Sequence, residues 1–312
     1  MLDLVYPVLV CLCALIIDRI FGEPEYHPLI LFGNLAGRLE KRLNQRRSRF
    51  LGFLTTLTLI GTPLGIIVFI DLSISHFWLK MAFDILILYF VIGWQSMKQH
   101  SMRIYQPLRV GDINLARINL AMIVSRQTED MNEAQIVGST IESVLENGHD
   151  CVFASLFWYL LLGPGGAIMH RLANTLDAMW GYKNERFCEF GFAAARFDDL
   201  LGYIPARLTA LSYALSGSFR NAIKAWRNQI GQHKSPNAGL VMASGAGALG
   251  IIIGGPAIYE GIEQQKPYLG SGRPAQPADI AASIRLIHRS LLVWLLVMTL
   301  VLYGIGLFIQ VS

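Results

Sequence analysis

Residues 50–70 read FLGFLTTLTLIGTPLGIIVFI and contain no charged side chain. A helix rises about 1.5 Å per residue and the hydrocarbon core of a bilayer is about 30 Å thick, so about 20 apolar residues can cross it. Residues 290–312 form a second uncharged stretch of comparable length. Both segments are predicted to be membrane-spanning helices.

Other apolar stretches are less clear-cut. Residues 4–17 and 81–94 are shorter, and the second carries Asp84. Both are expected to span the membrane with their polar ends snorkelling or packed against neighbours. Residues 152–169, 208–219 and 235–259 are also uncharged, but GPGG at 163–166 interrupts the first and the last is rich in Gly and Ala. For these three we expect re-entrant or interfacial helices.

The fold class predicted from these segments is all-α: a polytopic integral membrane protein with about 4–6 spanning helices, plus re-entrant or interfacial helices that carry the site. No repeat and no strand-like alternation stands out, and the Pro- and Gly-rich residues 266–277 predict an exposed loop before the last helix. We therefore expect a single integral membrane domain over residues 1–312, with residues 98–207 as its cytoplasm-facing catalytic region.

The composition agrees with a membrane protein. Of 312 residues, 53% are hydrophobic and only 15% are charged, whereas soluble domains carry about 25% charged residues. The net charge of +4 comes from local clusters and not from a basic strip with aromatics, which argues against a nucleic-acid partner. The four cysteines lack metal-ligand spacing and are expected to be small buried hydrophobes.

A dense basic cluster separates the first two predicted spans. The positive-inside rule places this segment in the cytoplasm, with the N-terminus, residues 71–80 and the C-terminus outside and residues 98–150 inside. The N-terminus has no basic region and no small-residue cleavage site, so we expect an uncleaved first helix. A bacterial inner membrane with the site facing the cytoplasm follows. The cluster consists of Arg38, Lys41, Arg42, Arg46, Arg47 and Arg49.

Two groups of carboxylates could carry chemistry. Glu142 and Glu146 are four residues apart and share one helix face, so they would bind a cation or form an ordinary solvated face. Asp198 and Asp199 are adjacent within an apolar segment. Because ionisable groups at membrane depth are costly, this pair would face a polar cavity, or it would form a helix N-terminus balanced by its neighbours. Mg²⁺ prefers one or two carboxylates together with phosphate oxygens.

Further polar residues lie along the same part of the chain. Asn147 and Asp150 follow the first carboxylates, and Arg196 and Arg207 flank the aspartate pair. Arginine forks suit phosphate or carboxylate ligands, although a solvated role is the default for each. The other candidates, each with a structural alternative, are His27, Arg117, Arg126, Asn174, Asp177 and Lys183.

One tempting motif is set aside. GAGALG at 245–250 matches G-x-G-x-x-G, but a stretch of Ala, Met and Ser precedes it and IIIGGP at 251–256 follows, in place of the strand and helix that a dinucleotide motif requires. Gly250 and Gly254 instead predict a small-residue seam for close helix packing. Neither a P-loop nor a nucleophile elbow occurs.

Taken together, these segments resemble the CobD/CbiB family of cobalamin biosynthesis, the adenosylcobinamide-phosphate synthases. The resemblance covers nearly the whole chain in order, although Gln127 and Gly202 depart from the usual pattern, where Asp and Asn are common. The segments that carry it are DR at 18–19, GEP at 22–24, HP at 27–28, AR at 116–117, SRQT at 125–128, ESVLEN at 142–147, GPGG at 163–166, NTLD at 174–177, ARFDD at 195–199, IPAR at 204–207, SPNAG at 235–239 and GG at 254–255.

The resemblance implies a membrane enzyme that amidates a propionate side chain of adenosylcobyric acid. The amine would be (R)-1-amino-2-propanol or its O-2-phosphate, the product cobinamide or cobinamide phosphate, and ATP with Mg²⁺ the driver. The corrinoid is then substrate and the lipid bilayer the setting. Association with other cobalamin-pathway enzymes or with a second copy of the chain is also expected.

The residues can be assigned to roles within this resemblance. Asp198, Asp199 and Glu146 are expected to hold Mg²⁺, and Glu142 or Asp177 to accept the proton of the amine. Cationic side chains would neutralise phosphate or a developing acyl phosphate. The expected substrate-binding residues are His27, Arg117, Arg126, Asn147, Asn174, Lys183, Arg196, Arg207 and Asn237.

Two other functions compete with this one. A non-enzymatic sensor or accessory protein could use the same scaffold, and a transporter could use midplane charges and broken helices. The charged motifs argue against the first. Their clustering in the predicted cytoplasmic region, without an inverted repeat, argues against the second.

Overall fold

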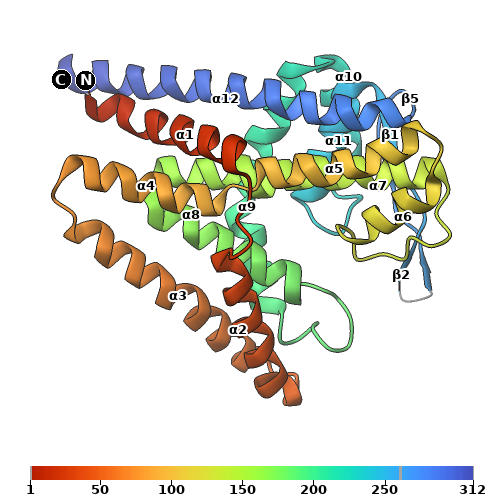
Figure 1. The fold of residues 1–312 in the computed structure, drawn as a ribbon, viewed down its shortest axis with the longest axis horizontal. Helices are drawn as coiled ribbons and strands as arrows, with labels where there is room; N and C mark the ends of the chain where they lie inside the picture. Colours follow the sequence, from red (N-terminus) through yellow and green to blue (C-terminus); the bar gives the residue numbers. More distant parts are fainter. Residues whose placement is uncertain (1, 260–261, 312) are drawn as a thin grey trace. The chain divides into compact units, whose positions relative to one another are not determined.

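The computed structural model describes residues 2–259 and 262–311, and most regular structure in this part of the chain is helical, as predicted (Figure 1). The chain forms two compact units: Met1–Trp94 with Asp150–Gly202, and Gln95–His149 with Tyr203–Ser312. Each unit combines two separate stretches of sequence. Neither is therefore a contiguous segment that could be cut out of the chain.

The first unit is built from long helices. Its elements are α1 (Leu2–Phe21), α2 (Pro28–Leu43), a 3₁₀ turn η1 (Asn44–Arg46), α3 (Arg49–Ser73), α4 (Phe77–Val91), most of a π-helical turn η2 (His149–Phe153), α8 (Ala154–Trp180) and the start of α9 (Phe192–Ser216).

The core of this unit lies where α2, α3, α8 and α9 meet. Trp180 and Phe190 pack edge to face with ring centroids 5.2 Å apart, and both side chains are buried. Gly52 of α3 lies directly against the backbone of Phe190, where any side chain would clash. The missing side chain therefore lets the segment before α9 approach α3 closely.

The outer face of α3 is apolar and exposed. Phe53, Leu57, Phe69 and Leu72 are each more than half exposed. Contiguous apolar exposure of this kind is unusual in a soluble protein and marks a surface that another apolar medium covers. This face is the lipid-facing side of a spanning helix.

The charge inside the apolar helix α4 is fully satisfied. Asp84 is buried, and its carboxylate accepts hydrogen bonds from the hydroxyls of Tyr6 (3.1 Å) and Tyr159 (2.9 Å). The ammonium of Lys80 lies 2.7 Å from Asp84 and 2.6 Å from Asp71. This network joins α1, α3, α4 and α8, so the expected packing of the polar group against neighbouring helices is confirmed.

The second unit combines helices with two small sheets. Its elements are α5 (Trp94–Arg109, from its second residue), α6 (Ile113–Ala121), α7 (Glu133–Gly148), the rest of α9, α10 (Phe219–Gln229), α11 (Ala238–Leu249), β1 (Ile251–Gly254), β2 (Ala257–Tyr259), β3 (Ile262–Gln264), β4 (Tyr268–Gly270), β5 (Arg273–Pro274) and α12 (Pro277–Val311).

Helix α7 begins at a capping box. The side chain of Asn132 accepts a hydrogen bond from the Gln135 amide, and the Gln135 side chain accepts one from the Asn132 amide. This reciprocal pair satisfies two of the backbone donors that a helix start leaves open. It fixes the register of the helix that carries Glu142 and Glu146.

Two short sheets depart from the expected helical chain. Strand β1 pairs antiparallel with β4 and parallel with β5, and β2 pairs antiparallel with β3. Gly250 ends α11 in the left-handed conformation (φ 68°), after which the β-branched residues Ile251, Ile252 and Ile253 form β1. Residues 266–277, expected to be an exposed loop, thus include β4 and β5.

The predicted helix-packing seam of Gly250 and Gly254 is therefore wrong, because the helix ends before both. Gly245 and Gly247, inside α11, provide the close packing instead. A side chain at Gly245 would clash with Leu145, and one at Gly247 with the backbone of α10.

Four helical stretches in the described part of the chain are long and apolar enough to cross a membrane: Arg49–Ser73, Phe77–Arg109, Glu133–Trp180 and Pro277–Val301. The first confirms the helix expected at 50–70, and the last covers the described start of that expected at 290–312. The chain is a multi-pass membrane protein. Helix α11 is buried along most of its length and, with 12 residues, is too short to span.

Candidate active site

Helix α8 is not straight but folds back on itself. Gly163 has φ 64° and ψ −156°, a conformation open only to glycine at little strain. The hydroxyl of Ser155 lies 3.4 Å from Nδ1 of His170, and Arg171 donates to the thiol of Cys151 at 2.8 Å. These pairs join positions 15 and 20 residues apart. The GPGG break is therefore the tip of a helical hairpin.

A cluster of carboxylates lies at the base of this hairpin. Asp150 precedes the first arm, Asn174 and Asp177 lie on the second arm, and Asp198 belongs to α9. Burial raises the pKa of Asp198 well above its usual range, and the negative charges of Asp150, Asp177 and Asp199 raise it further. A hydrogen bond from Asn174 opposes this shift. The fold thus gathers like charges that a cation would neutralise.

Two cations adjoin the outer side of the cluster. Burial raises the pKa of Asp199, and the positive charges of Arg196 and Lys183 lower it. The guanidinium of Arg196 lies 3.9 Å from Asp199, and both cationic side chains are exposed. The structure therefore places Asn174, Asp177, Lys183 and Arg196 beside the aspartate pair.

His27 lies close to the same hairpin, but its side chain binds a backbone amide. Its Nδ1 accepts a hydrogen bond from the Leu29 amide and caps α2, and its ring packs edge to face on Phe90. Burial lowers its pKa, and so does the charge of Arg171, while Glu23 raises it. With one ring nitrogen occupied, His27 fits the structural alternative better than substrate binding.

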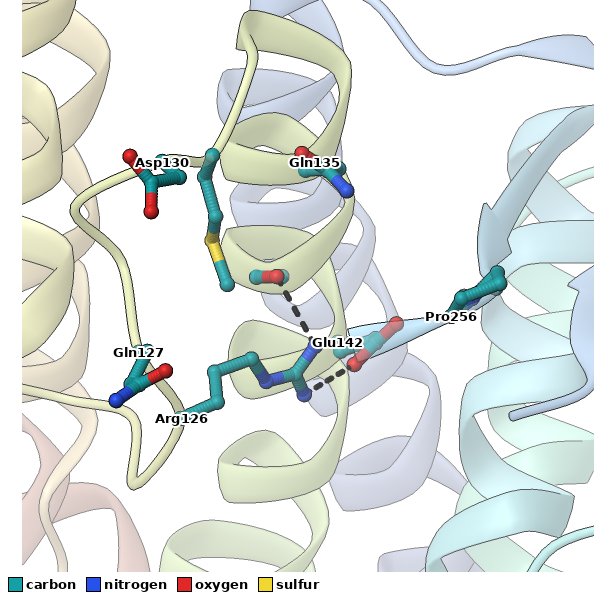
Figure 2. Close-up of a pocket in the computed structure, with 10 residues that line it drawn as sticks. Arg126, Gln127, Asp130, Gln135, Glu142 and Pro256 are labelled. Atoms are coloured by element: carbon teal, nitrogen blue, oxygen red, sulfur yellow. Dashed lines mark hydrogen bonds and ion pairs between the residues drawn. The ribbon is translucent and has the colours of Figure 1, made fainter. Parts of the chain in front are cut away.

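A second polar site lies in the other unit, where residues 123–131 run along α7. Arg126 donates to the hydroxyl of Ser139 at 3.0 Å and forms an ion pair with Glu142 at 2.7 Å (Figure 2). Only about a tenth of either side chain is exposed. Glu142 therefore holds Arg126 in place, and its Oε2 atom is occupied.

A cavity of about 200 Å³ adjoins this ion pair. Glu146 and Asn147 line it from α7, together with Arg126 and Glu142. His233 and Lys266 complete its charged lining from loops that sequence reasoning did not single out. No motif spacing connects these two residues to the rest, so only the fold reveals them.

Three predicted binding residues make other contacts. Arg117 donates to the Met131 carbonyl at 2.8 Å and so supports the segment that carries Arg126. Arg207 donates to the Tyr203 carbonyl at 2.6 Å, and its guanidinium lies over the Tyr203 ring. Asn237 is buried and precedes α11. These positions favour structural roles for the three.

The expected metal ligands are divided between the two sites. Asp198 and Asp199 lie in the first unit and Glu146 in the second. Among the described residues, no group of three or more His, Cys, Asp or Glu side chains is arranged to hold a metal ion. Mg²⁺ needs only one or two carboxylates when phosphate oxygens and waters complete its shell. The aspartate pair, with its raised pKa values, fits that requirement.

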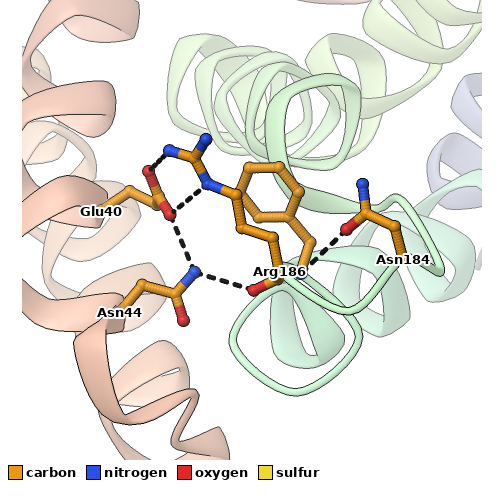
Figure 3. Close-up of polar contacts among 5 residues, drawn as sticks. Glu40, Asn44, Asn184 and Arg186 are labelled. Atoms are coloured by element: carbon orange, nitrogen blue, oxygen red, sulfur yellow. Dashed lines mark hydrogen bonds and ion pairs between the residues drawn. The ribbon is translucent and has the colours of Figure 1, made fainter. Parts of the chain in front are cut away.

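The loop between α8 and α9 is tied to α2 and its basic segment. The Arg186 guanidinium binds Glu40 at 2.7 Å, and the Asn44 amide donates to the Arg186 carbonyl at 2.9 Å (Figure 3). Arg186 and Asn44 lower the pKa of Glu40 against the effect of its burial. Arg47 also pairs with Glu185 at 2.6 Å. The two segments therefore lie side by side.

The chain is similar to known proteins over most of its length. A family model described as CobD/Cbib protein matches residues 11–287. A protein of Chromobacterium violaceum named cobalamin biosynthesis protein CobD is 44% identical over 290 residues, 90% of this chain and 92% of its own. Its namesake in Stutzerimonas stutzeri is 45% identical over 291 residues, covering 91% and 94%. That of Rhodobacter capsulatus is 35% identical over 298 residues, covering 92% and 95%.

No solved structure matches the chain. The family match covers most of the sequence, and it includes both the hairpin and the Arg126 site. The similarity to the relatives extends over nine-tenths of each protein. The chain therefore belongs to the CobD/CbiB family of cobalamin biosynthesis proteins.

Proposed function

We propose that this protein forms an amide bond between a propionate side chain of adenosylcobyric acid and (R)-1-amino-2-propanol or its O-2-phosphate. The observation that carries the proposal is the cluster of Asp150, Asp177, Asp198 and Asp199 at the base of the α8 hairpin. Partly buried like charges repel one another and favour a bound cation. In a biosynthetic enzyme they fit a cation bound together with phosphate.

The reaction needs an activated carboxylate. Joining a carboxylate to an ammonium releases water and is unfavourable in aqueous solution, so it is coupled to cleavage of ATP. Asp198 and Asp199 would hold Mg²⁺, which would neutralise phosphate charge. Lys183 and Arg196, beside Asp199, would bind phosphate oxygens.

The incoming ammonium must lose one proton before its nitrogen can bond to the carbonyl carbon, and a second after the bond has formed. Of the two expected bases, Glu142 is held by Arg126 through Oε2. Asp177 adjoins Asp198, and no ion pair with a cation is found for it among the described residues. We therefore assign the role of base to Asp177 and a positioning role to Glu142.

The membrane setting is proposed to be a bacterial inner membrane with the site facing the cytoplasm. The positive-inside rule places the basic segment before α3 there. The pairs Arg47–Glu185 and Arg49–Glu189 link this segment to the loop before α9 at 2.6 and 3.0 Å. The aspartate pair, which follows that loop, would then have access to cytoplasmic ATP.

A direct assay tests this proposal. Purified protein in detergent is given adenosylcobyric acid, either amine, ATP and Mg²⁺, and the corrinoid product is identified by mass spectrometry. We expect an amide product only with ATP, at least about 100-fold less product with Asp198→Asn or Asp199→Asn, and full activity with the surface control Glu133→Gln. Failure to form product while both substrates bind would favour the accessory-protein function instead.

A further inference from the structure

The cavity beside Arg126 has a lining of mixed charge. Arg126 and Lys266 contribute positive groups, while Glu142 and Glu146 contribute carboxylates from one face of α7. Serine hydroxyls and the Asn147 amide also line it. Such a lining offers partners to both ends of a zwitterion.

The size of the cavity limits its ligand. At about 200 Å³ it is smaller than the roughly 300–1,000 Å³ of pockets that enclose drug-sized molecules. A corrin macrocycle is much larger than such ligands, so it could not be enclosed there. A polyphosphate would meet the carboxylate of Glu146, which repels it. A small molecule with one cationic and one anionic end fits both limits.

The charges are not spread evenly over the lining. Glu142 already binds Arg126, so this pair is close to neutral as a unit. Burial lowers the pKa of His233, and the positive charge of Lys266 lowers it further. His233 is therefore neutral near pH 7 and can share a hydrogen bond with an anion held by Lys266. Glu146 contributes the second carboxylate of the lining.

We propose that this cavity is the subsite for the small amine substrate, with Lys266 and His233 binding its phosphate and Glu146 its ammonium. The inference rests on the proposed amidation for the identity of the ligand. It assigns Glu146 to substrate binding, whereas the sequence analysis expected this residue to bind Mg²⁺. Asp198 and Asp199 then remain as the two carboxylates that Mg²⁺ requires.

Isothermal titration calorimetry without ATP, Mg²⁺ and corrinoid tests the subsite directly. Aminopropanol phosphate and free aminopropanol are titrated separately into the full-length protein in detergent. We expect Lys266→Met to weaken binding of the phosphate by about tenfold or more and of the free amine by less than about twofold. Lys266→Arg should retain the preference for the phosphate over the free amine. Glu146→Gln should weaken the binding of both.

The matched control is Lys234→Met. Lys234 is exposed and donates to Gln264 at 2.8 Å, outside the lining of the cavity. Its replacement should leave both affinities unchanged. Thermal unfolding of every variant shows whether a loss of binding reflects a loss of fold. Should Lys266→Met unfold, Lys266→Gln and Glu146→Gln provide the same comparison.

The outcomes separate the two proposals. If amide forms but Lys266→Met and Glu146→Gln bind both amines like the unsubstituted protein, the subsite is wrong and the proposed function stands. If aminopropanol phosphate binds in a Lys266-dependent way but no amide forms, the subsite stands and the proposed function fails. Failure of the unsubstituted protein to bind either amine at millimolar concentration overturns the subsite.

Discussion

The hydroxyl of Ser155 lies 3.4 Å from Nδ1 of His170, and both side chains are buried. A continuous α-helix would hold residues 15 positions apart at about 22 Å. The chain must therefore reverse between them, and Gly163 is where it does so. The first arm, residues 154–162, is the end of a helical run that begins at Glu133, and the second arm, residues 164–180, follows the reversal. The hairpin brings polar residues from both of its ends together.

Replacing Gly163 by Val should destabilise the protein by about 1–3 kcal/mol, because a β-branched residue is strained at φ 64°. No heavy atom lies within 4 Å of the position a side chain would take, so the penalty comes from the backbone alone. Thermal unfolding in detergent measures it. Gly61→Val, in the regular helix α3 with similar free space, is the matched control and should be close to neutral. Equal melting temperatures for both variants would contradict the hairpin.

Replacing Asp84 by Ala should lower the free energy of unfolding by about 3 kcal/mol. The change leaves Lys80 with Asp71 alone and removes the acceptor of two tyrosine hydroxyls. Tyr159→Phe removes only one hydrogen bond and should lower it by about 1 kcal/mol. Urea or thermal unfolding in detergent would rank the variants. An effect of Asp84→Ala no larger than that of Tyr159→Phe would show that the network does not act as a unit.

The spanning helices could be predicted because lipid imposes a simple rule on sequence. Residues 50–70 contain no charge, and α3 covers them with its apolar side chains exposed. GPGG likewise predicted a break at Gly163. The full reversal there could not be predicted, because it depends on contacts between the arms such as that of Ser155 with His170.

The candidate site was predictable where its residues are close in sequence or share a helix face. Asp198 and Asp199 are adjacent, and Glu142 and Glu146 are one turn apart. Lys266 gave no such signal, since it lies in a loop far along the chain from α7. The strands at 251–274 were missed for a related reason: each has only two to four residues, too few for an alternating pattern.

Replacing Asp198 by Asn should raise thermal stability at neutral pH while it removes activity. Burial and neighbouring carboxylates raise the pKa of Asp198 in the folded state. The folded protein therefore binds more protons than the unfolded chain between the ordinary and the raised pKa, and stability falls as pH rises through that window. Asn cannot ionise, so this loss should disappear.

Melting temperatures measured from pH 4 to 8, in steps of about one unit, test whether stability falls as pH rises. The gain of Asp198→Asn over the unsubstituted protein should be largest at pH 8 and shrink toward pH 4. Mg²⁺ should stabilise the unsubstituted protein, since a ligand of the folded state shifts unfolding, and it should affect Asp198→Asn less. Glu133→Gln, at an exposed position, should show neither effect. A gain that is independent of pH would contradict the charge cluster.

The native thiol Cys188 can report the sidedness of the membrane. It is exposed in the loop between α8 and α9, whereas Cys11 and Cys151 are buried. The Arg47–Glu185 pair holds this loop beside the basic segment, which the positive-inside rule places in the cytoplasm. A membrane-impermeant maleimide should therefore label Cys188 in inverted vesicles and not in intact cells or spheroplasts. Cys188→Ser should remove this label, and it controls for labelling of the partly exposed Cys13. In that background, Lys183→Cys should be labelled from the same side. Labelling of either position only from the periplasm would move the aspartate pair away from cytoplasmic ATP, and with it the site of amide formation.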